Sequence, residues 1–110
     1  MALAGNATAI YSFETGNTLL RNCESNGGMD YGDCVGYLKA VSDGIRYNKG
    51  SFPNASHPER YIHNDICTPD GITAGQLVKV WVKWANDNPQ HLHLATQGLV
   101  MAAFAEAWPC

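Results

Sequence analysis

Four cysteines, Cys23, Cys34, Cys67 and Cys110, are the residues whose type and number most directly indicate chemistry in this chain. A cysteine can bind zinc, act as a nucleophile or form half of a disulfide. The chain has no CxxC pair, and only His63 lies within four residues of a cysteine, which argues against a structural zinc site. An even number of cysteines in 110 residues favours two disulfides and an oxidising compartment.

The four histidines do not complete a metal site or a catalytic site. His91 and His93 form an HLH motif, but residues i and i+2 lie about 200° apart around a helix and cannot share an ion. His57 and His63 lie in one irregular segment and would meet only if it folded back. The sequence also lacks converging carboxylates, a GxSxG motif and a glycine-rich phosphate loop. We therefore predict a protein that is not an enzyme and has no metal site and no cofactor.

Length and composition indicate a single domain, residues 1–110, that binds a protein or a small molecule. The formal net charge of −3 includes no basic cluster for nucleic acid or for an anionic membrane. No apolar run reaches the roughly 18 residues of a membrane-spanning helix. Residues 1–12 form an N-terminal tail without the basic start of a signal peptide, so we expect a mature domain from which the signal peptide was removed.

The hydrophobic periodicity predicts an all-α fold, a small four-helix bundle. The first helix begins after Thr15, a good N-cap, and carries Leu19, Leu20 and Cys23 at helical spacing. A glycine pair at residues 27–28 then ends this helix.

The second helix is expected to be capped by Asp30 or Asp33. Its apolar residues recur at steps of four, three and four and form one stripe: Cys34, Leu38, Val41 and Ile45. One side of this helix therefore faces the core.

The third helix has the clearest start signal in the chain. Thr73 is the expected N-cap, Gln76 completes a capping box, and Ile72 can pack on Leu77 as a hydrophobic staple. The apolar residues of this helix cover an arc of roughly 200°, which is too wide for contact with a single neighbouring helix.

Asn88 and Pro89 are predicted to open the fourth helix, whose apolar residues point in nearly every direction. A bundle this small cannot fully surround two such helices, so we expect a homodimer. The alternative is a monomer in which alanines fill much of the fourth helix. The predicted dimer interface consists of Val78, Trp81, Val82, Met101 and Phe104.

Topology favours one pairing of the cysteines. Cys23 lies near the end of the first helix and Cys34 near the start of the second, and a short connection makes these helices antiparallel. Cys67 precedes the third helix and Cys110 follows the fourth, so an antiparallel hairpin brings them together. The predicted disulfides are therefore Cys23–Cys34 and Cys67–Cys110.

Periodicity disappears in residues 48–66, a long loop that contains two prolines and three asparagines. Loops of this length in compact domains are usually functional or disordered. A surface insertion without function is the alternative.

Four ordered motifs resemble the Rap/Tai family. They are F-x-T-G-N-x-L at residues 13–19, C-x-G-Y at 34–37, P-x-G-[IV]-T-x-x-Q-L at 69–77 and aromatic-Pro-Cys at 108–110. Members of that family are immunity proteins against amidase effectors of the bacterial type VI secretion system, and the chain is most similar to the class-four members. The chain departs from the family pattern at Thr68, where an aliphatic residue is expected, and in the length of its loop.

The resemblance implies a helical, disulfide-bonded domain of the periplasm, commonly a homodimer, that binds a cell-wall amidase and blocks its substrate cleft. It carries over no catalytic residue. We expect the long loop to enter the amidase, with Phe52, Arg60 and Tyr61 as interface anchors. The full predicted effector-binding set is Ser51, Phe52, Asn54, Ser56, His57, Glu59, Arg60 and Tyr61.

Two other functions fit the composition. A periplasmic acid-stress chaperone would expose apolar surface on acidification, and the low charge is compatible with that. An apolar-ligand carrier would enclose a cavity lined by Trp81, Trp84 and Trp108, although tryptophans on packed helices are more often core residues.

Overall fold

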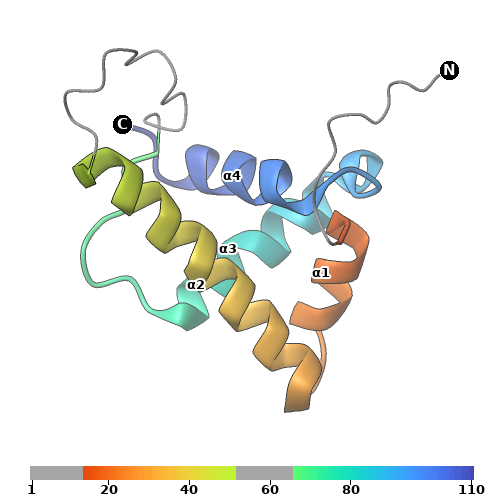
Figure 1. The fold of residues 1–110 in the computed structure, drawn as a ribbon. Coiled ribbons are helices and arrows are strands. Elements are labelled where there is room, and N and C mark those ends of the chain that lie inside the picture. Colours follow the sequence, from red (N-terminus) through yellow and green to blue (C-terminus); the bar gives the residue numbers. More distant parts are fainter. Residues whose placement is uncertain (1–13, 52–65) are drawn as a thin grey trace, which may run out of the picture.

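A computed structural model describes residues 14–51 and 66–110 of the chain. These residues form α-helices, with one 3₁₀ turn (η4) before the last helix and no β-strand (Figure 1). The elements are α1 (Gly16–Cys23), α2 (Gly28–Ser51), α3 (Ala74–Asp87), η4 (Pro89–His91) and α4 (Thr96–Ala107). The predicted all-α bundle is confirmed.

Each of the four helices packs against the other three, so they share a single core. Trp81 of α3 and Phe104 of α4 are its largest fully buried side chains. The stripe of α2 contributes Cys34, Leu38 and Ile45, and Ser42 is buried with them. Val41, which the apolar pattern predicts to be buried, is only half-buried. Ser42 is buried instead, and its polar side chain is not part of that pattern.

The backbone at the start of α1 pairs with the chain that leads into α4. The Gly16 N–H donates to the Leu94 carbonyl (3.1 Å) and the Asn17 N–H donates to the Leu92 carbonyl (2.9 Å). The first amides of a helix have no partner within it, and here carbonyl groups from a distant segment satisfy them. Thr15 is the N-cap as predicted, but its side chain makes no capping hydrogen bond.

The same pairing shows why the predicted fourth helix from Pro89 is wrong. In a continuous helix the Thr96 N–H would donate to the Leu92 carbonyl. It donates instead to the Glu14 carbonyl (3.2 Å), and the buried Thr96 hydroxyl donates to the same oxygen (2.6 Å). The chain therefore forms only a 3₁₀ turn at Pro89–His91, and α4 begins at Thr96.

Helix α2 is longer than predicted at both ends. It begins at Gly28, where Gly27 and Gly28 both have positive φ, and Asp30 lies in its first turn rather than at its cap. An acidic residue there interacts favourably with the helix dipole. The helix continues to Ser51, so the first four residues of the predicted 48–66 loop are helical.

The capping box of α3 is confirmed. The Thr73 hydroxyl accepts from the Gln76 N–H (3.1 Å), and the Gln76 side chain accepts from the Thr73 N–H (3.0 Å). Gly71 turns the chain into this cap with φ of 85°. Ile72 is half-buried against the core and lines the same hollow as Leu77, and its packing on Leu77 as a staple stays a prediction.

Gly16 allows the close approach of α1 to the segment before α4. A Cβ at this position would lie 2.6 Å from Leu99 Cδ1 and 3.1 Å from the Leu92 carbonyl oxygen, which the backbone pairing holds in place. We predict that Gly16→Ala lowers the free energy of unfolding by about 1–3 kcal/mol, as overpacking does in well-packed cores.

Chemical denaturation of Gly16→Ala beside Gly36→Ala measures this effect. Gly36 lies within α2, and apart from the adjacent backbone of its own helix no atom lies within 4 Å of a built Cβ, so alanine there should raise stability by about 0.5–1 kcal/mol. Equal stabilisation by both substitutions would contradict the close approach.

Candidate functional site

Most of the predicted effector-binding residues lie outside the part of the chain that the structure describes. Ser51 is the last residue of α2. The other seven, Phe52, Asn54, Ser56, His57, Glu59, Arg60 and Tyr61, fall within residues 52–65, so their role remains a prediction. The structure describes the chain on both sides of that segment, namely the end of α2 and residues 66–70. We call residues 66–70 the stem.

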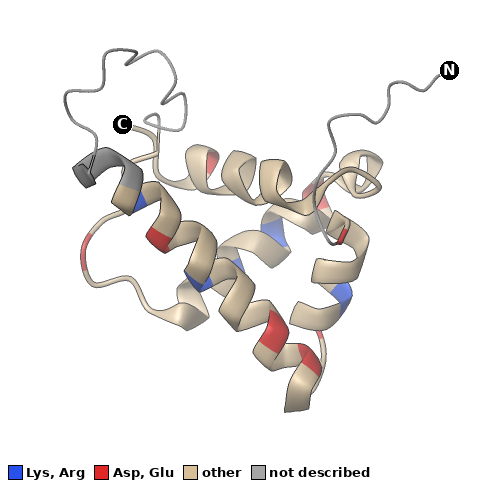
Figure 2. Ribbon diagram, viewed as in Figure 1, with Lys and Arg blue, Asp and Glu red and all other residues tan. Residues whose placement is uncertain are grey.

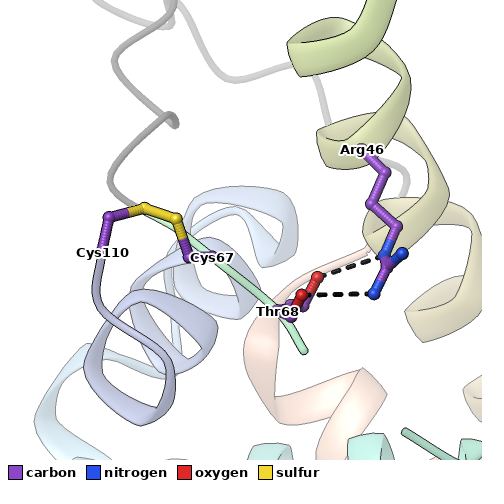
Figure 3. The surroundings of a disulfide bond; sticks show 4 residues. All are labelled: Arg46, Cys67, Thr68 and Cys110. Atoms are coloured by element: carbon purple, nitrogen blue, oxygen red, sulfur yellow. Dashed lines mark hydrogen bonds between the residues drawn. A yellow bond between two sulfur atoms is a disulfide. The ribbon is translucent and has the colours of Figure 1, made fainter. Parts of the chain in front are cut away.

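The stem is attached to the C-terminus of the chain. Ile66 is 2% exposed and forms an isolated antiparallel bridge with Pro109. The Cys67 N–H donates to the Trp108 carbonyl (2.8 Å), and the Cys67–Cys110 disulfide joins the same two segments (Figure 3). The predicted pairing of these cysteines is confirmed.

Arg46, in the last part of α2, holds the stem from the other side. Its Nε donates to the Thr68 hydroxyl (3.2 Å), and its Nη2 donates to the carbonyls of Thr68 (3.2 Å) and Pro69 (2.8 Å). Its Nη1 lies 3.3 Å from Asp70 Oδ1. The planar guanidinium presents donors in a fixed geometry, so one side chain contacts three consecutive residues. Figure 3 shows its contacts to Thr68.

Residues 52–65 therefore connect two parts of the bundle, the end of α2 and the stem, which Arg46 holds together. The end of α2, the stem and the C-terminus lie on the same side of the bundle (Figure 1). Tyr47, one turn before the end of α2, is 63% exposed there. An exposed aromatic side chain on a rigid helix is typical of protein-binding surfaces, and the periodicity of α2 does not distinguish it from a surface residue.

The second disulfide, Cys23–Cys34, is confirmed and has a different environment. Cys23 is 5% exposed and Cys34 is fully buried, and together they join the end of α1 to the first part of α2. By contrast, Cys67 and Cys110 are both exposed. One disulfide therefore belongs to the core and the other to the surface.

Three of the five predicted dimer-interface residues are covered by the chain itself. Trp81 and Phe104 are fully buried and Val78 is 7% exposed. Val82 and Met101 are half-buried and retain surface that a second subunit could contact. The wide apolar arcs of α3 and α4 are satisfied largely by α1 and α2.

Several shallow hollows are lined by described residues. One of about 400 Å³ lies between α2 and α4, and one of about 310 Å³ lies between α2 and the start of α3. A third, of about 260 Å³, is lined by α3 and α4 and includes Trp84. The three tryptophans do not line a common cavity, because Trp81 is in the core stacked on Trp84 and Trp108 packs against Phe104.

Charges of both signs are scattered over α2 and α3 (Figure 2). Burial, followed by the nearby Asp33 carboxylate, raises the pKa of Glu14 above its ordinary value. A hydrogen bond to Asp87, with the charge of that carboxylate, raises the pKa of Lys83. Neither group is part of the stem.

The described residues contain no group of three or more His, Cys, Asp or Glu side chains placed to hold a metal ion. Of the HLH pair, His91 stacks on Trp84 with ring centroids 6.5 Å apart. His57 and His63 lie outside the described residues. No helix in residues 14–51 or 66–110 has the length and hydropathy to cross a membrane.

Residues 15–110 match the family model of the Rap1a immunity proteins. The match begins at the N-cap of α1 and ends at the last cysteine, so it includes every described helix and both disulfides. No match to the chain was found among curated proteins or among solved structures.

The geometry of Arg46 predicts that lysine cannot replace it. A lysine retains the charge but cannot present several donors in one plane. Because the Arg46 side chain is 42% exposed and Asp70 fully so, charge attraction contributes little and the backbone hydrogen bonds contribute most. Arg46→Lys and Arg46→Met should each lower the free energy of unfolding by about 1 kcal/mol.

Lys39→Met, at an exposed cation on the same helix, is the control and should change stability by less than about 0.5 kcal/mol in urea denaturation. Wild-type stability of Arg46→Lys would show that a point charge is sufficient at this position.

Proposed function

The chain belongs to the family of Rap1a immunity proteins, and from this membership we propose that it protects its cell by binding and inhibiting a type VI secretion peptidoglycan amidase. Family membership implies an immunity protein against a secreted effector. The finer assignment is supported by the four sequence motifs, which resemble the class-four Rap/Tai proteins.

The mode of inhibition we propose is occlusion of the amidase cleft by residues 52–65. An inhibitor of this kind needs a protruding segment on a preorganised base, because ordering a free segment on binding costs affinity. The observation that carries the proposal is the attachment of the stem by Arg46 on one side and by Cys67–Cys110 on the other. Fixed ends reduce the conformational freedom that the segment loses in the complex.

The proposed contacts combine the predicted loop residues with one side chain of the described surface. Phe52, Arg60 and Tyr61 supply aromatic and guanidinium anchors, which dominate many interfaces. Tyr47, exposed beside the base of the segment, adds a fourth. The remaining proposed contacts are Ser51, Asn54, Ser56, His57 and Glu59.

Binding without catalysis is sufficient for this function, and a periplasmic location fits it. An immunity protein inactivates its effector by forming a complex and needs no reaction of its own. Both disulfides join residues of a small chain, and such bonds persist in oxidising compartments such as the periplasm. Peptidoglycan, the substrate of the proposed partner, is in the same compartment.

We retain the homodimer as part of the proposal, with a smaller interface than the sequence predicts. Val82 and Met101 are its members with exposed surface. Met101 also lines the hollow of about 400 Å³ between α2 and α4, whose other lining residues carry no charge.

Titration into a purified class-four type VI amidase tests the proposal directly. Hydrolysis of peptidoglycan fragments should fall in proportion to added protein and reach its minimum near one chain per amidase. An unrelated peptidoglycan amidase should be unaffected in the same assay. Full hydrolysis at excess protein with both disulfides intact would contradict the assignment to this effector class.

Truncation of the proposed anchors should separate binding from folding. Tyr47→Ala, Phe52→Ala and Arg60→Ala should each weaken the complex by about tenfold or more while the thermal midpoint stays within a few degrees, because residues of an interface contribute to binding rather than to the core.

Met29→Ala and Arg21→Ala are matched controls. Met29 is 85% exposed at the other end of α2, about 30 Å from Ser51 at 1.5 Å per residue. Calorimetric titration of the five variants compares the proposed interface with the α1–α2 end of the bundle. Parallel losses of binding and folding stability in the anchor variants would show that these residues are structural.

A further inference from the structure

The two disulfides differ in what surrounds them. Cys23 and Cys34 are buried in the core between α1 and α2, where a reductant cannot reach the sulfur atoms without opening the bundle. Cys67 and Cys110 are both exposed. Thiol–disulfide exchange requires direct attack on a sulfur atom, so access controls its rate.

The contacts around the exposed disulfide divide into two groups. Residues 66–67 contact the C-terminal segment through the Ile66–Pro109 bridge and the Cys67 N–H to Trp108 carbonyl hydrogen bond. Residues 68–70 are held by Arg46 of α2. The hydrogen bonds of Arg46 to Thr68 and Pro69 do not involve either cysteine. Opening the disulfide therefore loosens Cys67 and Cys110, while the buried Ile66 on one side and Arg46 on the other limit the change.

The helices have attachments of their own. Helix α4 ends at Ala107, before the disulfide, and its start is held by the pairing with Glu14 and Gly16. Helix α3 begins after the stem with its capping box intact. Nothing in these contacts requires Cys67 and Cys110 to be joined.

We propose that Cys67–Cys110 is a reducible latch on the stem, which a dithiol opens while Cys23–Cys34 and the four helices remain intact. One thiolate of the dithiol attacks a sulfur of this disulfide, which breaks the S–S bond and forms a mixed disulfide. The second thiolate of the dithiol then displaces the protein sulfur. The products are two cysteine thiols and one oxidised dithiol, a transfer of two electrons.

The latch is a property of the chain and does not depend on which effector it binds. Its consequence for inhibition does rest on the proposed function. With Cys67 released from Cys110, one end of the 52–65 segment loses part of its attachment, so the reduced protein should bind its effector more weakly.

Stepwise reduction tests the latch without any effector. The oxidised protein is incubated with a series of dithiothreitol concentrations, then alkylated and mapped by peptide mass spectrometry. Cys67 and Cys110 should be alkylated at a dithiothreitol concentration at least about tenfold lower than Cys23 and Cys34, because only the first pair is accessible. The far-ultraviolet circular dichroism should be unchanged over that interval. Simultaneous alkylation of all four, or loss of helix when the first pair opens, would overturn the proposal.

A double variant provides the second test. Cys67→Ser with Cys110→Ser should fold with the helix content of the wild type, and hydrogen exchange of the residue 67 amide should rise by about tenfold or more. The Gln76 amide, which donates within the α3 capping box, is the internal reference and should not change. A double variant that does not fold, or that protects the residue 67 amide as the wild type does, would overturn the latch.

Discussion

The burial of α4 is the constraint on which the arrangement of the other helices depends. Glu106 is the one charged residue among its twelve, and apolar side chains occur around its whole circumference. A helix of this kind is stable in water only when other elements cover most of its sides. Helices α1, α2 and α3 all pack against it, and its Val100, Ala103 and Phe104 are almost completely buried.

Both ends of α4 are fixed to segments far away in the sequence. At its start the backbone of residues 92–96 exchanges hydrogen bonds with residues 14–17, which also supplies partners for the first amides of α1. Beyond its end, residues 108–110 pair with residues 66–67. The central helix of the core therefore also carries the base of the 52–65 segment, which connects the packing of the bundle to the proposed interface.

Short-range chemistry made several features predictable from sequence. The Thr73 capping box depends on residues three apart, and the two disulfides follow from helix order once their number is known. The break before α4 was not predictable, because Asn88–Pro89 is a good helix start and the competing acceptor, the Glu14 carbonyl, is 82 residues away. A carbonyl oxygen is common to every residue type and leaves no mark in the sequence.

The stem shows the same limit within the candidate site. Arg46 finds its acceptors 22 to 24 residues along the chain, and two of them are backbone carbonyls. Thr68, a departure from the family pattern, becomes interpretable only with Arg46 beside it, because its hydroxyl accepts from the guanidinium. Three residues predicted for the dimer interface, Val78, Trp81 and Phe104, are buried within the chain itself, since periodicity measures how much surface is apolar and not what covers it.

The most direct test of the account is a hydrogen-exchange comparison of the free protein with its complex with the cognate amidase. Amides at the end of α2 and in residues 66–70 should exchange more slowly in the complex. Amides of the α1–α2 connection, at the opposite end of α2, should exchange equally in both states. Slower exchange at the α1–α2 connection with no change around the stem would contradict the account, because the effector would then bind the wrong end of the bundle.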